Sequence, residues 1–419
     1  MKIRVHCLGA GQEVGRSCFL LETDVRVLLD YGIKIFSKEG GKRNAYPLPF
    51  QGEIHGAFIS HAHLDHSGFV PEIYTRGTVP WYSTPPTFDI ADILWKDSMK
   101  IMGPKLPYRR SHFEKAQKNW IPLLYDHGLP LGETTFRFRD AGHILGSASI
   151  EAEYKGKRVV YSGDFKMGDT QLHRGAKPVK DVDVLILETT YSDRDHPERK
   201  ETKKLIKERV EGTLGEGGCV LFPAFAVGRS QEVLMVLREQ LGNEVPIYLD
   251  GMSKAVTRTY LKYNGYMRDF DKFEEVVDST ILVENYGDRK EATSIPSVIV
   301  STAGMMEGGP ALRYLLNLPP NSRMVFTGYN VEGTNGWRIL NQKKVKIDQN
   351  LLDVEVPAEY MDLSAHVGRS GLLEYIKKAN PGRIILNHGD HCVEFAEELR
   401  GKGYEVYAPV NGEMMEFEF

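Results

Sequence analysis

The stretch SHAHLDHSG, residues 60–68, holds three histidines and one aspartate, in a chain of 419 residues that has 13 histidines in all. Histidine and aspartate are poor core residues, so packing does not account for this crowding. His61 and His63 are two residues apart, and in extended backbone alternate side chains point to the same side. These two imidazoles can hold one metal ion, whereas Asp65 and His66 point elsewhere, toward a second ion. The stretch therefore predicts a two-metal site, and its imidazole and carboxylate ligands favour zinc.

Four side chains cannot complete the coordination of two ions, and three further donors follow runs that are typical of strands. They are His143 in AGHILGS, Asp164 in YSGDF and His388 in ILNHGDH. Taken singly, each is as consistent with a structural residue as with a ligand. Taken together with the 61–66 motif, they complete the expected number of ligands.

The length of the chain exceeds that of a single ordinary core, which predicts two domains, one of them inserted into the other. The formal net charge of −4 gives no sign of a nucleic-acid-binding protein, so any polyanion has to be held by a local patch. Two basic runs are candidates: residues 96–118, with seven Lys or Arg against two acids, and RKETKKLIKER at 199–209. The alternative for both runs is a solvated helix face.

The four cysteines, Cys7, Cys18, Cys219 and Cys392, form no CxxC pair and are too few to cross-link a chain of this size, which indicates a reducing compartment. The N-terminus lacks the apolar region of a signal peptide, and no run of 18 apolar residues occurs. These features predict a cytoplasmic protein that does not associate with membranes.

The order of expected elements changes along the chain. Strand-like runs fill residues 1–31, GAFIS leads into the 61–68 loop, and helices are expected from about Phe69 and over 87–101. After about residue 195, strands alternate with helices, which is typical of a parallel α/β unit. From about residue 346 come the strand LLDVEVP, a helix from about Val367, the strand RIILN and a last helix. The fold class predicted is α/β.

With these motifs placed, the chain resembles the metallo-β-lactamase superfamily, and specifically its β-CASP nuclease branch. Asp30 lies where the first motif of the superfamily is expected, SHAHLDHSG is the second, and His143 and Asp164 fall in the third and fourth. The three additional β-CASP motifs match as well: LILETTYSDR with Glu188, DLSAH with His366, and LNHGD with His388.

The resemblance implies an αββα sandwich interrupted by an α/β β-CASP domain. The expected boundaries are 1–195 for the first part of the metallo-β-lactamase domain, 196–345 for the β-CASP domain and 346–419 for the returning part. The active site would then lie in the cleft between the two domains, where single strands enter and duplexes do not.

The resemblance also implies roles for individual residues. One zinc ion would be held by His61, His63 and His143, the other by Asp65, His66 and His388, with Asp164 bridging them. Asp30 would orient a ligand without binding metal itself, as such sites require. His366 would protonate the leaving oxygen, and Glu188 would orient His366. The expected catalytic residues are His366, Glu188, Asp30 and Asp65.

Three stretches, FPAFAVGRSQE, VSTAGMMEGGP and GYNVEGTNG, resemble the RNA-cleaving members, among them the nuclease subunit of the eukaryotic cleavage and polyadenylation factor. The small residues after the strand at 297–301 could cradle a phosphate with backbone N–H groups, which makes Ser301 and Gly304 expected contacts. Arg229 is either a phosphate ligand or a plain surface arginine. Ser364 completes the expected substrate-binding residues.

The function predicted is that of a zinc-dependent ribonuclease that cuts single-stranded RNA and leaves a 5′-phosphate and a 3′-hydroxyl. Internal cutting is favoured, and trimming from the 5′ end stays open, as do a homodimer and membership of an RNA-processing complex. Because the metal motif begins at residue 61, no RNA-binding domain is expected before it, and affinity would depend on the cleft alone and be sensitive to salt.

Three alternatives remain on the sequence alone. A DNA nuclease of the same branch is the nearest alternative, although a histidine in the third β-CASP motif, here His388, is the version that resembles the RNA-cleaving members. A small-molecule metallo-hydrolase would need residues 61–66, 143 and 164 but neither DLSAH nor LNHGD. A silent scaffold of a processing complex would be expected to have lost metal ligands, and this chain has lost none.

Overall fold

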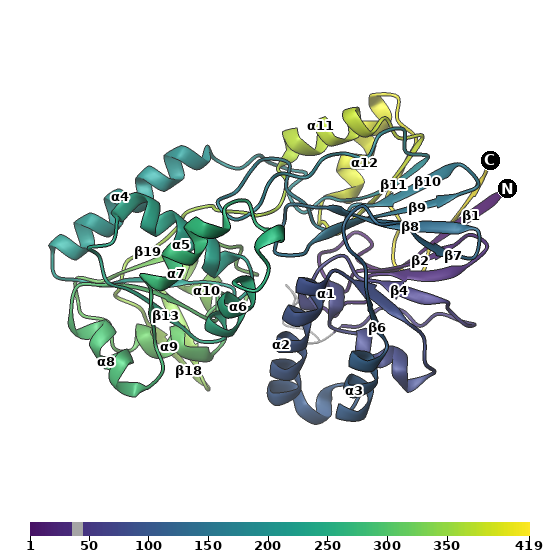
Figure 1. The fold of residues 1–419 in the computed structure, drawn as a ribbon. Helices are drawn as coiled ribbons and strands as arrows, with labels where there is room; N and C mark the ends of the chain where they lie inside the picture. Colours follow the sequence, from purple (N-terminus) through teal and green to yellow (C-terminus); the bar gives the residue numbers. More distant parts are fainter. Residues whose placement is uncertain (36–44) are drawn as a thin grey trace.

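The protein forms two lobes that lie side by side in a computed structural model, which describes residues 1–35 and 45–419 (Figure 1). One lobe carries both chain termini, and the other consists of a continuous middle segment of the chain. The chain crosses from the first lobe to the second before α4 (Arg199–Gly215) and returns after β19 (Ala358–Tyr360).

The first lobe is built on two seven-stranded sheets. The first sheet has the order β22-β1-β2-β3-β4-β5-β6, and it is antiparallel from β22 to β3 and parallel from there on. Its strands are β1 (Lys2–Gly9), β2 (Cys18–Glu22), β3 (Arg26–Leu29), β4 (Gly56–Phe58), β5 (Trp81–Ser83), β6 (Trp120–Pro122) and β22 (Met414–Glu418). The last strand of the chain therefore pairs with the first.

The second sheet has the order β21-β20-β11-β10-β9-β8-β7. Its strands are β7 (Leu129–Leu131), β8 (Thr134–Asp140), β9 (Ala148–Tyr154), β10 (Lys157–Tyr161), β11 (Val184–Glu188), β20 (Arg383–Asn387) and β21 (Val406–Tyr407). The returning strand β20 pairs in parallel with β11, in a register that sets Asn387 beside Glu188. This pairing brings the last tenth of the chain next to the middle of it.

Hydrophobic side chains fill the space between the two sheets and cover both outer faces. The inner core joins residues such as Phe19 and Val27 of the first sheet to Phe136 and Ile150 of the second. The helices α2 (Pro85–Met102) and α3 (Arg110–Lys118) cover one outside, and α11 (Arg369–Ala379) and α12 (Cys392–Gly401) cover the other (Figure 1). The predicted αββα sandwich is confirmed.

The second lobe is a parallel sheet with helices on both faces, as the alternating pattern after residue 195 predicts. The six strands, in the order β14-β13-β15-β12-β16-β19, are all parallel. They are β12 (Val220–Pro223), β13 (Ile247–Asp250), β14 (Ile281–Leu282), β15 (Val298–Ser301), β16 (Arg323–Phe326) and β19. The helices besides α4 are α5 (Arg229–Leu241), α6 (Ser253–Tyr260), α7 (Phe270–Asp278), α8 (Tyr286–Ser294), α9 (Gly309–Leu315) and α10 (Asn335–Gln342).

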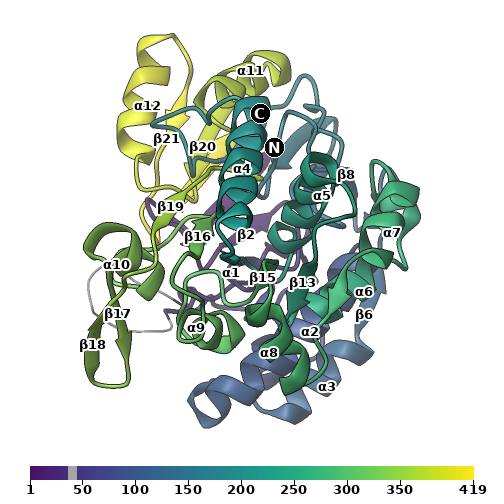
Figure 2. The same cartoon turned by 90° about the vertical axis from the view of Figure 1, so that its left-hand side faces the viewer.

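Two segments differ from the elements expected from sequence. The run LLDVEVP lies partly in β18 (Asn350–Asp353), which forms a separate hairpin with β17 (Lys344–Ile347) that projects from the second lobe (Figure 2). Asp348 makes this hairpin possible because it adopts the left-handed conformation (φ 53°) that a tight turn needs. The sheet of this lobe continues to Tyr360 in β19, which lies beyond the expected domain boundary near residue 345. The position of that boundary stays a prediction.

The helix expected from about Phe69 begins earlier and is broken. A single turn, α1 (Leu64–Ser67), lies within the histidine-rich stretch, and a 3-10 helix follows at Val70–Thr75. Gly68 ends the first turn, and Pro71, which lacks a backbone N–H, begins the second. Further 3-10 turns occur at Gly103–Lys105 and Asn264–Tyr266.

All four cysteines are buried and free. Among the described residues, no helix combines the length and the apolar character needed to cross a membrane.

Candidate metal centre

The stretch 60–68, here called the histidine loop, follows β4 and is held on both sides by backbone hydrogen bonds. Tyr31 N donates to His66 O at 2.8 Å, and Ser17 N donates to Asp65 O at 2.8 Å. Gly32 lies so close that a Cβ atom there would be 1.8 Å from Asp65 O, which only glycine avoids. The β-sheet thus fixes the position of the loop before any ligand binds.

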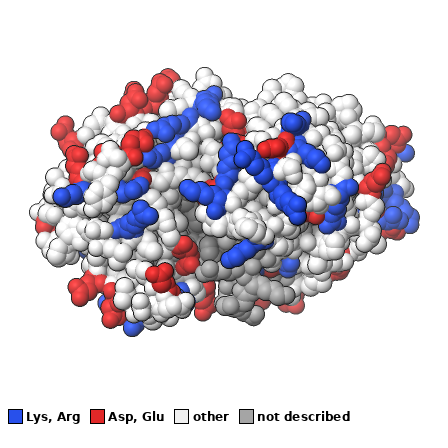
Figure 3. All heavy atoms as spheres, turned by 90° about the horizontal axis from the view of Figure 1, so that it is seen from below, with Lys and Arg blue, Asp and Glu red and all other residues white. Residues whose placement is uncertain are grey.

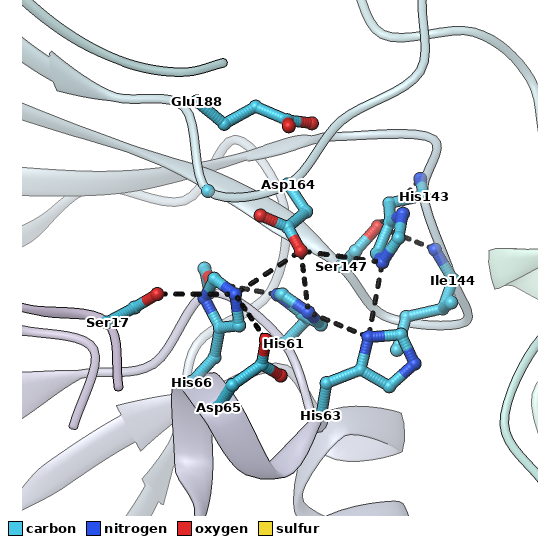
Figure 4. Close-up of polar contacts among 12 residues, drawn as sticks. Ser17, His61, His63, Asp65, His66, His143, Ile144, Ser147, Asp164 and Glu188 are labelled. Atoms are coloured by element: carbon cyan, nitrogen blue, oxygen red, sulfur yellow. Dashed lines mark hydrogen bonds and ion pairs between the residues drawn. The ribbon is translucent and has the colours of Figure 1, made fainter. Parts of the chain in front are cut away.

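The first group of donors consists of three imidazoles from two separate loops. His61 Nε2 and His63 Nδ1 lie 3.1 Å apart, and His143 Nε2 lies 3.3 Å from His63 Nδ1 (Figure 4). The turn after β8 presents His143, whose Nδ1 lies 3.0 Å from Ala365 O, so the distal nitrogen faces the group. These three nitrogens converge on one point, as the alternation of His61 and His63 predicts.

The second group joins the histidine loop to the end of β20. His388 Nε2 lies 3.3 Å from Asp65 Oδ2, and His66 Nε2 lies 3.9 Å from the same oxygen. The ligand atoms of Asp65, His66 and His388 all fall within 4.8 Å of one another. Residues separated by more than 300 positions in the chain therefore meet at one place.

Asp164 lies between the two groups and faces both. Its Oδ2 is 3.6 Å from His61 Nε2 and 3.3 Å from His66 Nε2 (Figure 4). Its Oδ1 is 3.5 Å from His388 Nδ1. The side chain is buried, and Oδ1 has no hydrogen-bond partner among the described residues. A buried carboxylate oxygen without a donor is costly unless a cation reaches it.

The donor set fits zinc. A tetrahedral site with Zn–N bonds of about 2.0–2.1 Å sets its nitrogens roughly 3.3 Å apart, which agrees with the spacing of the first group. Burial lowers the pKa of His61 and His143 well below the usual value, and that of His63 to about 4, which leaves these imidazoles in the neutral form that binds metal.

The second group has the opposite electrostatic character. Burial alone would lower the pKa of His66, but Asp164, Asp65 and Asp30 raise it well above the usual value. A proton is thus attracted to a point where several carboxylates converge. The same field attracts a divalent cation, and metal binding would release that proton.

Asp30 does not face the ligand groups but fixes them from behind. Its Oδ2 lies 2.7 Å from His66 Nδ1 and accepts hydrogen bonds from Ser60 Oγ and Tyr161 OH, both at 2.7 Å, while Ser60 N donates to Oδ1 at 2.6 Å. The carboxylate is fully buried. It therefore orients His66 so that Nε2 points to the second group, as a residue behind a metal ligand should.

Asp30→Asn is expected to weaken metal binding about 10- to 100-fold and to lower the free energy of unfolding by about 2–3 kcal/mol. The NH2 group of asparagine would face the hydrogen-bond donors that now surround Asp30. Asparagine nevertheless tolerates the left-handed backbone conformation of Asp30 (φ 60°), so the backbone should not change. Metal titration and chemical denaturation measure both effects. Asp24→Asn, at an exposed turn, is the control, and equal metal affinity in the two variants would contradict the orienting role.

His366 and Glu188 form a pair beside the donors. His366 Nδ1 lies 3.2 Å from Glu188 Oε1 and 3.9 Å from Asp164 Oδ2. Burial opposes protonation of His366, but Glu188 and Asp164 raise its pKa, so the imidazole is suited to carry a proton next to the donors. Lys166 Nζ donates to His366 O at 2.8 Å and anchors the loop that carries it.

Thr190 connects this pair to the second group. Its hydroxyl donates to Glu188 Oε2 at 2.5 Å and lies 3.1 Å from His388 O and 3.2 Å from His388 Nδ1. Phe165 N also donates to Glu188, at 3.1 Å from Oε1. The carboxylate is thus held from both sides, and one side chain couples it to a metal-ligand candidate.

Thr190→Val, which removes the hydroxyl and keeps the shape, is expected to reduce cleavage about 10-fold while leaving the metal content unchanged. Losing a hydrogen bond to a charged group costs about 1.5–3 kcal/mol, and Glu188 would then no longer hold His366 in place. Single-turnover cleavage and elemental analysis of one preparation measure both quantities. Thr190→Ser keeps the hydroxyl and should retain activity; if it were as slow as valine, the coupling role would be wrong.

The predicted substrate-binding residues lie at different distances from this centre. Ser364 Oγ accepts a hydrogen bond from His366 N at 3.1 Å, and Arg229 lines a small cavity together with Arg199, His143 and Ala365. The Nε atoms of Arg199 and Arg229 are buried and have no hydrogen-bond partner among the described residues.

Ser301 and Gly304 are not drawn into the centre. Ser301 is fully buried at the end of β15, with Oγ 3.4 Å from Thr302 O. A Cβ at Gly304 would lie 2.9 Å from Phe225 N, so this glycine permits close backbone packing. Within the described part of the chain, no contact joins either residue to the donor groups.

Sequence reasoning missed three residues that fix the centre: Ser60, Tyr161 and Thr190. Ser60 and Thr190 adjoin predicted residues in their motifs, SHAHLDHSG and LETTYS, which could have marked them. Tyr161 ends a strand three residues before Asp164, and no local pattern connects it to Asp30. Only the packing of the two sheets brings its hydroxyl there.

Comparison with known proteins gives two matching family models. A model described as the Beta-Casp domain matches residues 230–339, and one described as a Zn-dependent metallo-hydrolase RNA specificity domain matches residues 353–409. The first match lies within the second lobe, and the second includes His366 and His388.

Similar proteins of known name align over nearly the whole chain. A probable RNase from Methanocaldococcus jannaschii is 36% identical over 97% of this chain and 98% of its own length. RNase aCSPSF2 from Saccharolobus solfataricus is 33% identical over 97% of this chain and 84% of its own length. Transcription termination factor FttA from Methanosarcina mazei is 34% identical over 96% of this chain and 69% of its own length.

A solved structure shares the fold. The crystal structure of a protein of unknown function from Enterococcus faecalis V583 superimposes with a TM-score of 0.67 at 14% sequence identity, covering both chains completely. At that identity the likeness concerns the fold alone.

Proposed function

Because this chain belongs to the β-CASP ribonuclease branch of the metallo-β-lactamase superfamily, we propose that it is a two-zinc ribonuclease that hydrolyses phosphodiester bonds of single-stranded RNA. The chain is a hydrolase of the metal-dependent type and an RNA nuclease by its family. The number and identity of the ions, the strandedness of the RNA and the roles of single residues belong to the proposal.

In this proposal, His61, His63 and His143 would hold one ion, Asp65, His66 and His388 would hold the other, and Asp164, which approaches both groups, would contribute to each. When bound, two such ions supply a nucleophile from water at neutral pH and neutralise charge on the phosphate. The protein contributes the position of its ligands: Asp30 holds His66, and Ala365 O lies 3.0 Å from His143 Nδ1.

His366 acts as the general acid in this proposal. The leaving oxygen needs a proton, and an imidazole whose pKa is raised by Glu188 and Asp164 can hold one at neutral pH. Glu188 Oε1 lies 3.2 Å from His366 Nδ1 and occupies that nitrogen. His366 Nε2 is therefore the nitrogen that would face the leaving group. A proton donated there would produce a 3′-hydroxyl, and the phosphate would remain on the 5′ side of the downstream fragment.

Arg229 and Ser364 would bind the phosphate next to the scissile one. Arg229 shares a cavity with His143 and Ala365, and an unpartnered guanidinium Nε favours an anionic ligand. For Ser301 and Gly304 we propose an indirect role, in which they shape the loop after β15. Internal cutting is favoured in this proposal because FPAFAVGRSQE, VSTAGMMEGGP and GYNVEGTNG resemble the nuclease subunit of the cleavage and polyadenylation factor.

The observation that supports this proposal most is the sharing of Asp164. One buried carboxylate approaches donors of both groups at 3.3–3.6 Å and lies 3.9 Å from His366. A small-molecule metallo-hydrolase would need the two groups but not the His366–Glu188 pair. A DNA nuclease of the same branch would use a similar metal centre, but His388 in the third β-CASP motif resembles the RNA-cleaving members.

The test uses RNA labelled at its 5′ end that carries either a monophosphate or a triphosphate, with DNA of the same sequence beside it, each with and without chelator. Internal fragments from both RNAs, lost with chelator and restored by zinc, are expected. Mononucleotides from the monophosphate RNA alone would replace internal cutting by 5′ trimming. Equal cleavage of DNA, or cleavage that survives chelation, would overturn the substrate or the metal assignment, respectively.

A further inference from the structure

We propose that α2, α3 and the turn between them form a docking surface for RNA outside the metal centre, which binds backbone phosphates of the strand that flanks the scissile bond. We call this surface the basic ridge, and it consists of Lys96, Lys100, Lys105, Arg109, Arg110, Lys115 and Lys118. Its ligand follows from the proposed function, whereas its existence as an anion-binding surface does not. On this proposal, RNA affinity would depend on the ridge as well as on the cleft between the lobes.

The charge of the ridge is largely uncompensated. All seven side chains are exposed, and only two acids, Asp97 and Glu114, lie in the same segment. Salt bridges join Lys96 to Asp92 at 2.5 Å and Arg110 to Glu114 at 3.1 Å. The other four lysines of the ridge form no salt bridge with any acid of the described residues. They are Lys100, Lys105, Lys115 and Lys118. Figure 3 shows blue side chains gathered across the middle of the underside, where α2 and α3 form the lower edge in Figure 1.

The other basic run of the sequence has a different environment. On α4, Lys203 pairs with Glu239 at 2.7 Å, Lys204 with Glu208 at 4.0 Å and Lys207 with Glu211 at 3.7 Å. Three of the four lysines on α4 thus have an acid within 4.0 Å on their own helix or on α5, and Lys200 forms no salt bridge with an acid of the described residues. The tertiary structure therefore distinguishes lysines that lie beside acids from lysines that do not, which composition could not do.

The ridge is built on the segment that supports the histidine loop. Trp95 Nε1 donates to Ser67 O at 3.1 Å, and Tyr108 OH donates to Gly68 O at 2.9 Å. Gly68 lies two residues beyond the metal-ligand candidate His66, and Arg109 directly follows Tyr108. The backbone at Arg109 therefore lies within roughly 10–15 Å of the histidine loop. This distance equals the length of about three or four residues of extended chain.

The second lobe adjoins the same helix. Tyr263 OH donates to Asp89 Oδ2 at 3.0 Å, and Lys262 lies 3.5 Å from the same oxygen, so the region of α6 packs against α2. A strand held between the two lobes would therefore emerge close to α2. Phosphates beyond the cleft would then meet the row of lysines.

The composition of the ridge favours RNA over a membrane surface. Within residues 96–118, which are all described, Ile101 is the one large hydrophobic side chain that is exposed, at 74%. A membrane-binding helix presents a broad apolar face beside its cations. Here the apolar face of α2, with Ile90, Leu94 and Trp95, is buried in the core, so charge is the main attraction that the ridge offers.

The experiment compares two quadruple variants of the metal-loaded protein. One removes the unpaired lysines of the ridge (K100Q/K105Q/K115Q/K118Q), and the matched control removes four lysines of α4 (K200Q/K203Q/K204Q/K207Q). Binding of a labelled single-stranded RNA of about thirty nucleotides is read by stopped-flow anisotropy before cleavage, over a series of salt concentrations. Cleavage of an RNA of about six nucleotides, which fills the cleft alone, is measured beside it.

The ridge variant is expected to bind the long RNA about tenfold or more weakly, with the slope of log Kd against log salt reduced by about 3, since each single-strand phosphate contact contributes about 0.7. Its cleavage of the short RNA should remain at the wild-type rate. Should the quadruple variant fold poorly, K100Q/K105Q and K115Q/K118Q are each expected to reduce the slope by about 1.4.

Three results would overturn the ridge: unchanged binding of long RNA, an equal loss in the α4 control, or loss of binding to anionic phospholipid vesicles with RNA affinity unchanged. Failure of the proposed function looks different. In that case neither RNA is cleaved by the wild-type protein, while the stopped-flow measurement still reports whether the ridge binds the strand.

Discussion

Asp164→Asn is expected to reduce RNA cleavage by about 10³-fold or more and to lower the metal content of the purified protein. Changes behind the ligands of metal sites already cost about 10- to 100-fold, and Asp164 approaches both donor groups directly. Asparagine keeps the size of the side chain but removes the charge. His388 and His66 hold the pKa of Asp164 well below its usual value, against the effect of burial, so the charged form is the one that the site stabilises.

Single-turnover cleavage and elemental analysis of the same preparation measure the two effects together. Asp169→Asn is the matched control, because Asp169 lies five residues away, is exposed, and accepts a hydrogen bond from Gly175 N that an asparagine oxygen can also accept. The control should keep both activity and metal. An Asp164→Asn protein with a full complement of metal and wild-type cleavage would show that the two groups do not share this carboxylate in function.

His366→Ala should reduce cleavage of ordinary RNA about 10²- to 10⁴-fold, the usual range for a lost general acid. The acid role predicts a specific rescue. If the leaving 3′-oxygen of the substrate is replaced by sulfur, the leaving thiolate needs no proton, because thiols are far more acidic than alcohols. On that substrate the variant should cleave at a rate close to that of the wild-type protein.

The rescue distinguishes protonation from metal binding. His366 lies within reach of Asp164 and Glu188, and these three residues could themselves hold an ion. If His366 were a ligand, alanine would lower the metal content and the sulfur substrate would remain slow. Full metal content without rescue would also remove the acid assignment and leave His366 a positioning residue.

The local parts of the centre could be predicted from sequence because their geometry is local. His61 and His63 converge since they alternate in extended backbone. Asp65 and His66 lie in the turn α1 and join His388 in the second group, with the His66 ring 4.0 Å from that of His61. The donors that end strands, Asp164 and His388, could be predicted only as candidates. Resemblance to a family assigned them to groups, and the pairing of β20 with β11 accounts for their meeting.

The remaining parts depend on contacts between segments that carry no common pattern. Tyr161 reaches Asp30 across the sandwich, and Thr190 donates to Glu188 and lies 3.1 Å from the backbone oxygen of His388. The early start of α1 and the separate β17–β18 hairpin were likewise mispredicted, since a short apolar run fits several elements equally well.

The basic runs show the same limit in the distribution of charge. The segments 96–118 and 199–209 look alike as sequence, but three lysines of α4 have acids one helical turn away or on the neighbouring helix α5. By contrast, four lysines of the ridge, Lys100, Lys105, Lys115 and Lys118, are exposed and form no salt bridge with an acid of the described residues. The sequence by itself predicted the candidate donors and determined the class of the fold and the family. Only the tertiary structure decided how closely Asp164 approaches the donors and which cations remain unpaired, because both depend on distances between residues that the chain order does not set.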